Sequence, residues 1–396
     1  MRHLLVILAL VLLTSLFATH LFAQDTLTLG FPLPLTGPMA KFGEAMQRGY
    51  EIAAEEINAA GGIKGKKVVL VFEDSQGRPE ISRTIVEKLI DVKKQQIILA
   101  EYSSSCTKVI AAVAEERKVP FLIACGSADE ICQQNYKYVV RLQTATAYYA
   151  SGFLSFLKQV VKPKTFAILS ESSDFGTAGA DAMVKDVTNL GMKVLVKEQY
   201  EKGAVDFRPI LSKIKVAKPD VIYMVSYVMD AALMMKQIKE LRIDAKLFAG
   251  GAAGFAIPEF IQSAKDAAEY VMTATLWSPQ VNYPGAKEFA EKYKAKYNDY
   301  PSYHSAQSHS CLYIAKDTLE RAKSWTPDAI RDALKATNLM TVYGLAKFED
   351  RNGYQGQTFI DSLVMQVIKG KYETIWPEKY ASSKYVFPIP RWRDRK

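Results

Sequence analysis

Cysteine is scarce in this sequence, with four residues among 396. The cysteines lack the paired spacing of a zinc site, so we expect no metal ion. In an exported chain they can form disulfides, but four cysteines allow three pairings and the sequence does not choose between them. Cys125 and Cys132 lie close enough along the chain to close a short loop, and the other two are Cys106 and Cys311.

Histidine is equally scarce, and the motifs of common enzyme classes are missing. His304 and His309 are the only histidines after residue 23, and they share one segment of helical spacing, which does not suit a Ser-His-Asp triad. We interpret both as ordinary helix positions rather than ligand contacts. No Walker A loop is present, and Gly250–Gly254 lacks the spacing of a dinucleotide fingerprint. We therefore expect a protein that is not an enzyme and needs no cofactor.

Long apolar stretches are absent after the N-terminus. Residues 1–23 have the layout of a secretory signal peptide, with Arg2, an apolar core at Leu4–Phe17 and a cleavage site near Ala23. No later segment reaches the ~20 apolar residues that span a membrane. We expect a soluble protein exported to the periplasm.

Charge is not concentrated anywhere in the chain. The formal net charge is +9, and the lysines are scattered over segments with helical spacing. They are not interleaved with aromatic residues as in nucleic-acid modules, so we expect no nucleic-acid partner. We interpret the most basic segment, Arg391–Lys396, as a frayed terminus.

Short apolar segments alternate with segments that have the spacing of amphipathic helices. The first strands are expected at Thr26–Phe31, Lys67–Glu73, Gln95–Ala100 and Val119–Ala124, and the alternation restarts after Arg141. Nearly continuous apolar strands separated by helices are typical of a parallel, doubly wound sheet. No Gly/Ser-rich linker separates the halves, so we expect two α/β domains joined by short crossovers.

Small polar residues follow two of these strands. Serines 103–105 come after Gln95–Ala100, just before the helix expected at Thr107–Arg117, and Cys125–Ser127 follows the next strand. Ligands of parallel sheets bind beyond the carboxyl ends of the strands, and helix N-termini favour anions. The serine turn therefore suits a carboxylate or a phosphate. The alternative is that one of the serines is simply the N-cap of the helix.

Four segments spread over nearly the whole chain carry a family resemblance. The first is PLTGPMAKFGEAMQRGYEIAAEEINAAGGIKGKKVVLVFEDSQ at Pro34–Gln76, and the others are Val161–Gly176, Asp206–Tyr227 and the segment around Pro301–Leu319. Together they resemble the leucine/isoleucine/valine-binding family of bacterial periplasmic solute receptors. The resemblance implies an α/β fold of the type I periplasmic binding protein class. Two Rossmann-like lobes are then joined by three hinge crossovers and close on a ligand between them.

The resemblance also gives a domain division and a monomeric state. We place the crossovers near Gln143, Thr275 and Asn352. After the signal at residues 1–23, the N-terminal lobe then comprises residues 24–143 and 275–352, and the C-terminal lobe comprises residues 144–274 and 353–396.

The resemblance implies a ligand site made by two turns and several aromatic rings. In amino-acid binders of this family the two turns hold the ligand's carboxylate. Here the first turn is Ser104 with its neighbour Ser105, and the second is the Cys125 backbone with Gly126 and Ser127. Ordinary core packing is the alternative for each aromatic residue. The aromatic residues expected around the ligand are Phe42, Tyr102, Phe175 and Tyr227.

One departure from the family pattern concerns the ligand's ammonium group. Amino-acid binders carry a carboxylate in the turn after Leu247–Ala249, where this chain has Gly250, Gly251 and Ala252. A buried ammonium without a counter-charge is strongly unfavourable. The departure therefore favours a carboxylate without an amine and with an aromatic or apolar body. The alternative is that Asp230 or Glu101 replaces the missing acid.

These inferences predict a solute-binding protein that delivers a small carboxylate to an ABC permease in the inner membrane. Two alternatives stay open at this point. One is a branched-chain or other amino-acid binding protein of the same transporter class. The other is a periplasmic ligand sensor that partners a membrane receptor.

Overall fold

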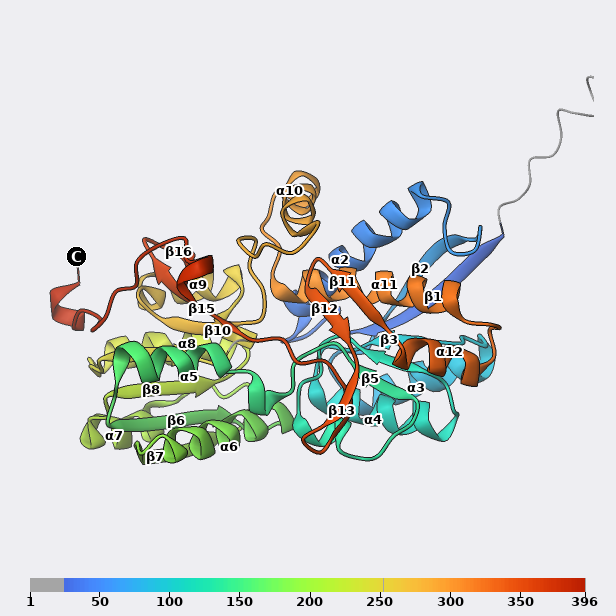
Figure 1. The fold of residues 1–396 in the computed structure, drawn as a ribbon. Helices are drawn as coiled ribbons and strands as arrows, with labels where there is room; N and C mark the ends of the chain where they lie inside the picture. Colours follow the sequence, from blue (N-terminus) through green and yellow to red (C-terminus); the bar gives the residue numbers. More distant parts are fainter. Residues whose placement is uncertain (1–24, 252, 396) are drawn as a thin grey trace, which may run out of the picture.

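Two lobes lie side by side along the long axis of the molecule (Figure 1). The structure is a computed structural model and describes residues 25–251 and 253–395. The described chain begins at the far end of one lobe and ends at the far end of the other. Within these residues, none of the helices combines the length and the apolar character needed to cross a bilayer. The predicted signal peptide at residues 1–23, with its cleavage site near Ala23, lies outside the described residues.

The first lobe is built on a five-stranded sheet with the order β13-β14-β5-β4-β3. All strands run parallel except β13, which pairs antiparallel with β14. A separate parallel pair, β1 (Thr26–Leu33) and β2 (Lys67–Asp74), lies next to it. The Gln95 side chain attaches β1 to the start of β3, because it bonds the N–H of Gly30 at 2.7 Å and its C=O at 3.1 Å. The sheet strands are β3 (Ile98–Ala100), β4 (Phe121–Ile123), β5 (Val139–Arg141), β13 (Glu349–Arg351) and β14 (Tyr354–Gln357).

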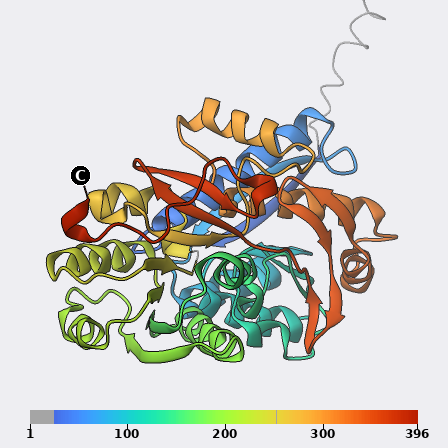
Figure 2. The ribbon, with the colours of Figure 1, turned by 60° about the vertical axis from the view of Figure 1, so that its left-hand side comes forward.

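Helices and one hairpin cover this first sheet. Helix α2 (Ala40–Ala59) buries one apolar stripe and packs against α11 (Tyr303–Arg321). Helix α10 (Ala286–Tyr297) lies at the outside of the molecule in both views (Figures 1 and 2). The remaining elements are α3 (Pro79–Glu87), α4 (Ser104–Glu116), α12 (Pro327–Lys335), and the hairpin of β11 (Asn338–Thr341) and β12 (Gly344–Lys347).

The second lobe is built on a seven-stranded sheet with the order β16-β15-β10-β9-β8-β6-β7. Its strands β6 to β10 run parallel, and β15 runs antiparallel to both of its neighbours. The strands are β6 (Thr165–Glu171), β7 (Lys193–Tyr200), β8 (Val221–Val225), β9 (Leu247–Gly250), β10 (Met272–Thr275), β15 (Leu363–Ile368) and β16 (Lys371–Trp376). The helices are α5 (Ser151–Phe156), α6 (Asp174–Asn189), α7 (Arg208–Ala217), α8 (Val228–Glu240) and α9 (Pro258–Ala264).

Short 3-10 and π segments complete the secondary structure. They are Lys88–Val92, Asp129–Cys132, Thr146–Tyr148, Leu157–Val161, Ala253–Phe255, Lys265–Ala268, Glu378–Tyr380 and Trp392–Asp394.

The predicted alternation of strands and helices is confirmed, but the third crossover differs from the prediction. Strand β14 pairs with β5, with Gln357 opposite Arg141. The chain therefore enters the second sheet between Gln357 and Leu363, not near Asn352. The strands β11 to β14 were not predicted, because segments of three or four residues are too short to show an apolar periodicity. The lobe boundaries near Gln143 and Thr275 stay predictions.

All four cysteines are buried and unpaired. The structure therefore contains none of the disulfide pairings that the sequence allows. Burial disfavours the charged thiolate, which raises the pKa of the Cys106 thiol to about 12. Cys106 therefore acts as a packed side chain next to the serine turn rather than as a reactive thiol.

Candidate ligand-binding site

A buried cavity lies between the lobes, where the strand ends of the two sheets face each other. About 250 Å³ of space unoccupied by atoms lies in and at the mouth of this cavity, including the part that is open to solvent. A larger hollow around Lys162 and Lys193 lies at the opposite end of strand β6 and is open to solvent. The cavity is lined by Tyr102, Ser104, Cys125, Ser127, Gln143, Tyr149, Phe175, Tyr227, Ala253, Tyr303 and His304.

The turn after β3 places serine hydroxyls at the N-terminus of α4. Ser103 is the helix N-cap, because its Oγ accepts the N–H of Cys106 at 3.2 Å. Ser104 begins the helix, and its Oγ accepts the N–H groups of Ser127 and Ala128, each at 3.1 Å. A hydroxyl that accepts two hydrogen bonds still has one hydrogen to donate. The capping role considered for one serine therefore belongs to Ser103, while Ser104 can donate into the cavity.

The turn after β4 supplies further donors. Among the described residues, no acceptor is bonded to the backbone N–H of Cys125 or Gly126. The Thr146 hydroxyl lies 2.7 Å from the carbonyl oxygen of Ser127 and 3.1 Å from its Oγ. Because the one hydrogen of the Thr146 hydroxyl is donated to the nearer carbonyl oxygen, the Ser127 hydroxyl can donate either to Oγ1 of Thr146 or into the cavity. Glycine is required at position 126, because a Cβ there would lie 2.2 Å from Oγ1 of Thr107.

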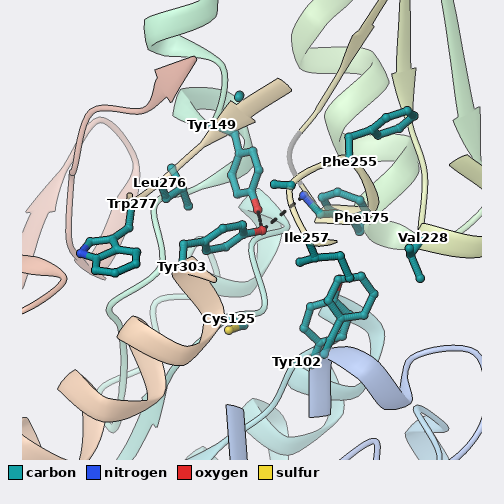
Figure 3. Close-up of a cluster of buried hydrophobic side chains, with 14 of the residues drawn as sticks. Tyr102, Cys125, Tyr149, Phe175, Val228, Phe255, Ile257, Leu276, Trp277 and Tyr303 are labelled. Atoms are coloured by element: carbon teal, nitrogen blue, oxygen red, sulfur yellow. Dashed lines mark hydrogen bonds between the residues drawn. The ribbon is translucent and has the colours of Figure 1, made fainter. Parts of the chain in front are cut away.

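Aromatic rings from both lobes meet around the cavity (Figure 3). Phe42 stacks on Tyr102, with ring centroids 4.2 Å apart and planes 6° from parallel. The Tyr227 ring lies 5.9 Å from Tyr102 and 5.6 Å from Phe175. Phe42 is fully buried and does not line the cavity, so it supports the Tyr102 ring instead of facing the space.

The first turn of α11 contributes a contact between the lobes. The hydroxyls of Tyr303 and Tyr149 lie 2.5 Å apart, and the Tyr303 hydroxyl accepts the N–H of Ala253 at 3.3 Å (Figure 3). Helix α11 packs in the first lobe, whereas Ala253 follows β9 in the second. The Tyr303 hydroxyl therefore bridges the two sides of the cavity.

The two histidines of α11 have different positions, and the interpretation of His304 needs correction. The His304 ring lines the cavity, 5.2 Å from Phe42 and 5.3 Å from Tyr102. Burial lowers its pKa to about 3, so the imidazole is neutral at pH 7. His309 faces away from the cavity, where its Nε2 lies 2.9 Å from Oε2 of Glu56, as expected for an ordinary helix position.

Of the described residues that line the cavity, none is Asp, Glu, Lys or Arg. Glu101 and Asp230, the two alternatives for the missing acid, are buried but bonded elsewhere. Glu101 accepts the Ser75 hydroxyl at 3.3 Å, and burial raises its pKa to about 8. Asp230 accepts the N–H of Gly203 at 3.0 Å. The cavity therefore offers hydrogen-bond donors to an anion and no counter-charge to a cation.

The structure brings most of the predicted site residues together. Ser105 is half-buried on α4 outside the cavity lining, and Gly251 lines an adjoining hollow that is also lined by Asp186. Whether any of these residues contacts a ligand stays a prediction. Those that line the cavity are Tyr102, Ser104, Cys125, Ser127, Phe175 and Tyr227, with Gly126 between them.

Five residues that line the cavity were not predicted as site residues, namely Gln143, Tyr149, Ala253, Tyr303 and His304. The strongest signal for them is the aromatic cluster of Tyr300, Tyr303 and His304 at the start of the segment around Pro301–Leu319, which carries the family resemblance. Periodicity alone places these residues on a helix and does not say which lobe or cavity that helix faces.

Known proteins share this sequence pattern and this fold. The family described as periplasmic binding protein matches residues 26–371. The leucine-, isoleucine-, valine-, threonine-, and alanine-binding protein of Pseudomonas aeruginosa is 27% identical over 343 residues, which cover 87% of this chain and 91% of that protein.

Solved structures give the same result. The leucine-binding protein LivK from Thermotoga maritima has a TM-score of 0.82 and 25% identity, covering 88% of this chain and 98% of that one. A solute-binding protein of an ABC transporter from R. palustris, in complex with benzoate, has a TM-score of 0.76 and 18% identity, covering 89% and 96% of the two chains. At 18% identity, the comparison with the R. palustris protein shows a shared fold only.

Proposed function

The chain belongs to the periplasmic binding protein family, and on that premise we propose that it binds a small carboxylate without an amine and delivers it to a membrane permease. The family and its type I fold are those of ABC-transporter substrate-binding proteins rather than enzymes. The ligand has an aromatic or apolar body and lies between the lobes. Export to the periplasm and a monomeric state are part of this proposal.

The observation that carries the proposal is the polarity of the cavity. Ser104, Ser127 and the Cys125 N–H supply donors on one wall, and the described lining residues include no charged side chain. Donors directed at one point stabilise an anion, whereas a buried ammonium would lack a partner. A carboxylate without an amine uses the donors and brings no ammonium group that would need a counter-charge.

The aromatic wall supports an apolar body. Tyr102, Phe175 and Tyr227 present ring faces and edges that suit a flat or branched hydrocarbon group. The benzoate complex of the R. palustris protein supports an aromatic acid as one ligand that this fold can hold.

The alternative is an amino acid, which is favoured by the name of the Pseudomonas aeruginosa relative. Asp186 is the acid most relevant to that alternative, because it lines the hollow that adjoins the cavity and shares Tyr149 and Phe175 with it. Burial raises the pKa of the Asp186 carboxyl, so it is a weaker counter-charge than an exposed carboxylate. A ligand sensor on the same fold remains a further alternative for the partner.

The test uses pairs of acids that differ only in the amine. The chain without residues 1–23 is melted with leucine and 4-methylpentanoate, and with phenylalanine and 3-phenylpropanoate; benzoate is added as a small aromatic acid. A ligand at ~100 times its dissociation constant stabilises the folded state by about 2.7 kcal/mol. We expect a rise in melting temperature with the amine-free member of a pair and none with its amino acid. The reverse pattern would overturn the proposal, and Asp186→Asn would then identify the ammonium partner.

A further inference from the structure

Arg141 is a fully buried arginine behind the turn that follows β4. It ends strand β5, and its side chain has no exposure to solvent. Its Nη1 donates to the carbonyl oxygens of Gly126 at 3.1 Å and Ala128 at 2.7 Å, and its Nε donates to Oε1 of Gln357 at 2.6 Å. All three acceptors are neutral. Its Nη2 has no hydrogen-bond partner among the described residues.

The acidic groups around Arg141 are bonded to other partners. Asp129 accepts the N–H of Ala147 at 3.0 Å and the hydroxyl of Tyr354 at 2.8 Å, and within the described chain it forms no ion pair with Arg141. A guanidinium that is removed from water without an anionic partner is unfavourable. An anion that binds near Arg141 is therefore favoured.

The contacts of Arg141 connect this charge to the cavity. The two carbonyl groups that it holds flank Ser127, whose hydroxyl lines the cavity. The N–H groups of Ser127 and Ala128 are held from the other side by Ser104. The turn is thus held on one side by the Arg141 guanidinium and on the other by the Ser104 hydroxyl, to which we assign a hydrogen bond with the ligand's carboxylate.

We propose that Arg141 is the positioning residue that gives the cavity its preference for an anion over a neutral ligand of the same shape. It fixes the turn at Gly126–Ala128 and places a positive charge behind the donors without contacting the ligand. This inference rests on the proposed function, since it assigns the electrostatic origin of carboxylate selection at the same cavity.

The size of the effect follows from Coulomb's law. At an effective dielectric constant of about 20, a unit charge favours the anion roughly tenfold in affinity, about 1.4 kcal/mol, if the two charges are separated by about 12 Å. We therefore expect loss of the charge to lower the ratio of acid to amide affinity roughly tenfold.

The experiment compares an acid with its amide in charge-changing variants of the mature protein. Calorimetric affinities are measured for benzoate and benzamide, and for 4-methylpentanoate and 4-methylpentanamide. The variants are Arg141→Gln, which retains a neutral donor, and Arg141→Lys, which retains the charge. Arg83→Gln, on the exposed face of α3, is the control for the overall loss of one positive charge. Each variant is melted first to establish that it is folded.

We expect the ratio of acid to amide affinity to fall roughly tenfold in Arg141→Gln and to stay within about threefold of the wild type in Arg141→Lys and Arg83→Gln. A purely structural role would weaken the acid and the amide equally and leave the ratio unchanged, which would overturn the inference. If Arg141→Gln does not fold, a tenfold loss of the ratio in folded Arg141→Lys overturns it, and a retained ratio supports it. Wild-type protein that binds none of these acids would instead contradict the proposed function.

Discussion

Replacement of Ser104 by alanine should reduce ligand affinity strongly and reduce folding stability moderately. The Ser104 hydroxyl has two roles in the structure. Its oxygen accepts the N–H groups of Ser127 and Ala128 at 3.1 Å each, and its hydrogen is free to be donated into the cavity. Ser104→Ala removes the donor to the ligand and leaves two buried N–H groups without an acceptor.

The two roles give two separate magnitudes. A hydrogen bond to a charged group contributes about 1.5–3 kcal/mol, so the dissociation constant of a carboxylate should rise about tenfold to 150-fold. A buried N–H that loses its partner costs about 1–3 kcal/mol. Because a change of 1 kcal/mol shifts the melting temperature of domains of this size by about 2–4 °C, the unliganded variant should melt several degrees lower.

Calorimetric titration with the acid selected in the melting screen measures the first effect, and melting without ligand measures the second. Ser105→Ala is the matched control, because Ser105 occupies the next position of α4 outside the cavity lining. We expect the control to bind within about twofold of the wild type. Unchanged affinity in Ser104→Ala would refute the assignment of this turn to the ligand's carboxylate. A stability loss without an affinity loss would show that Ser104 only connects the two turns.

Two further predictions concern buried titratable groups, and both are measured by chemical unfolding at several pH values. Burial raises the pKa of Glu101 to about 8, so between pH 4.5 and 8 the folded state holds a proton that the unfolded state has lost. The free energy of unfolding therefore falls as the pH rises through this window, by up to about 5 kcal/mol. Glu101→Gln should be more stable than the wild type by several kcal/mol at pH 9 but not at pH 4. An equal difference at the two pH values would contradict the assigned pKa. Burial lowers the pKa of His304 to about 3, so below pH 6.5 the unfolded state takes up a proton that the folded state does not bind. This group therefore lowers the free energy of unfolding by about 2 kcal/mol as the pH falls from 7 to 5, and His304→Gln should lose that part of the pH dependence. A variant with the wild-type slope would show that other groups cause it.

The sequence was sufficient for the elements that carry strong local signals. Apolar strands followed by amphipathic helices predicted the doubly wound lobes. The serines at the start of α4 predicted either a helix N-cap or donors to an anion; the N-cap is Ser103, and donation by Ser104 to a ligand stays a prediction. These features depend on neighbouring residues, so spacing along the chain contains the required information.

The remaining features depend on residues far apart in the chain. Tyr303 bonds the backbone of Ala253, 50 positions away, and Gln307 bonds the thiol of Cys125, 182 positions away. Such contacts depend on how the two lobes pack together, and the spacing of residues along the chain does not predict them. The polar strand β14 was missed for a related reason, because its place in the first sheet depends on pairing with β5 and not on its own composition.

The glycine-rich turn after β9 determines how readily the ligand charge could change during evolution. A Cβ at Gly251 would lie 2.7 Å from the Tyr223 hydroxyl oxygen, and a Cβ at Gly250 would lie 2.1 Å from the Phe255 ring. Both rings are buried, so a side chain at either of these two glycines requires the neighbouring ring to shift. At Gly251 the nearest atom is the terminal hydroxyl oxygen of Tyr223, which Tyr223→Phe removes. We therefore expect Gly251→Asp to be tolerated better after Tyr223→Phe than alone, so that a counter-charge at position 251 needs two substitutions.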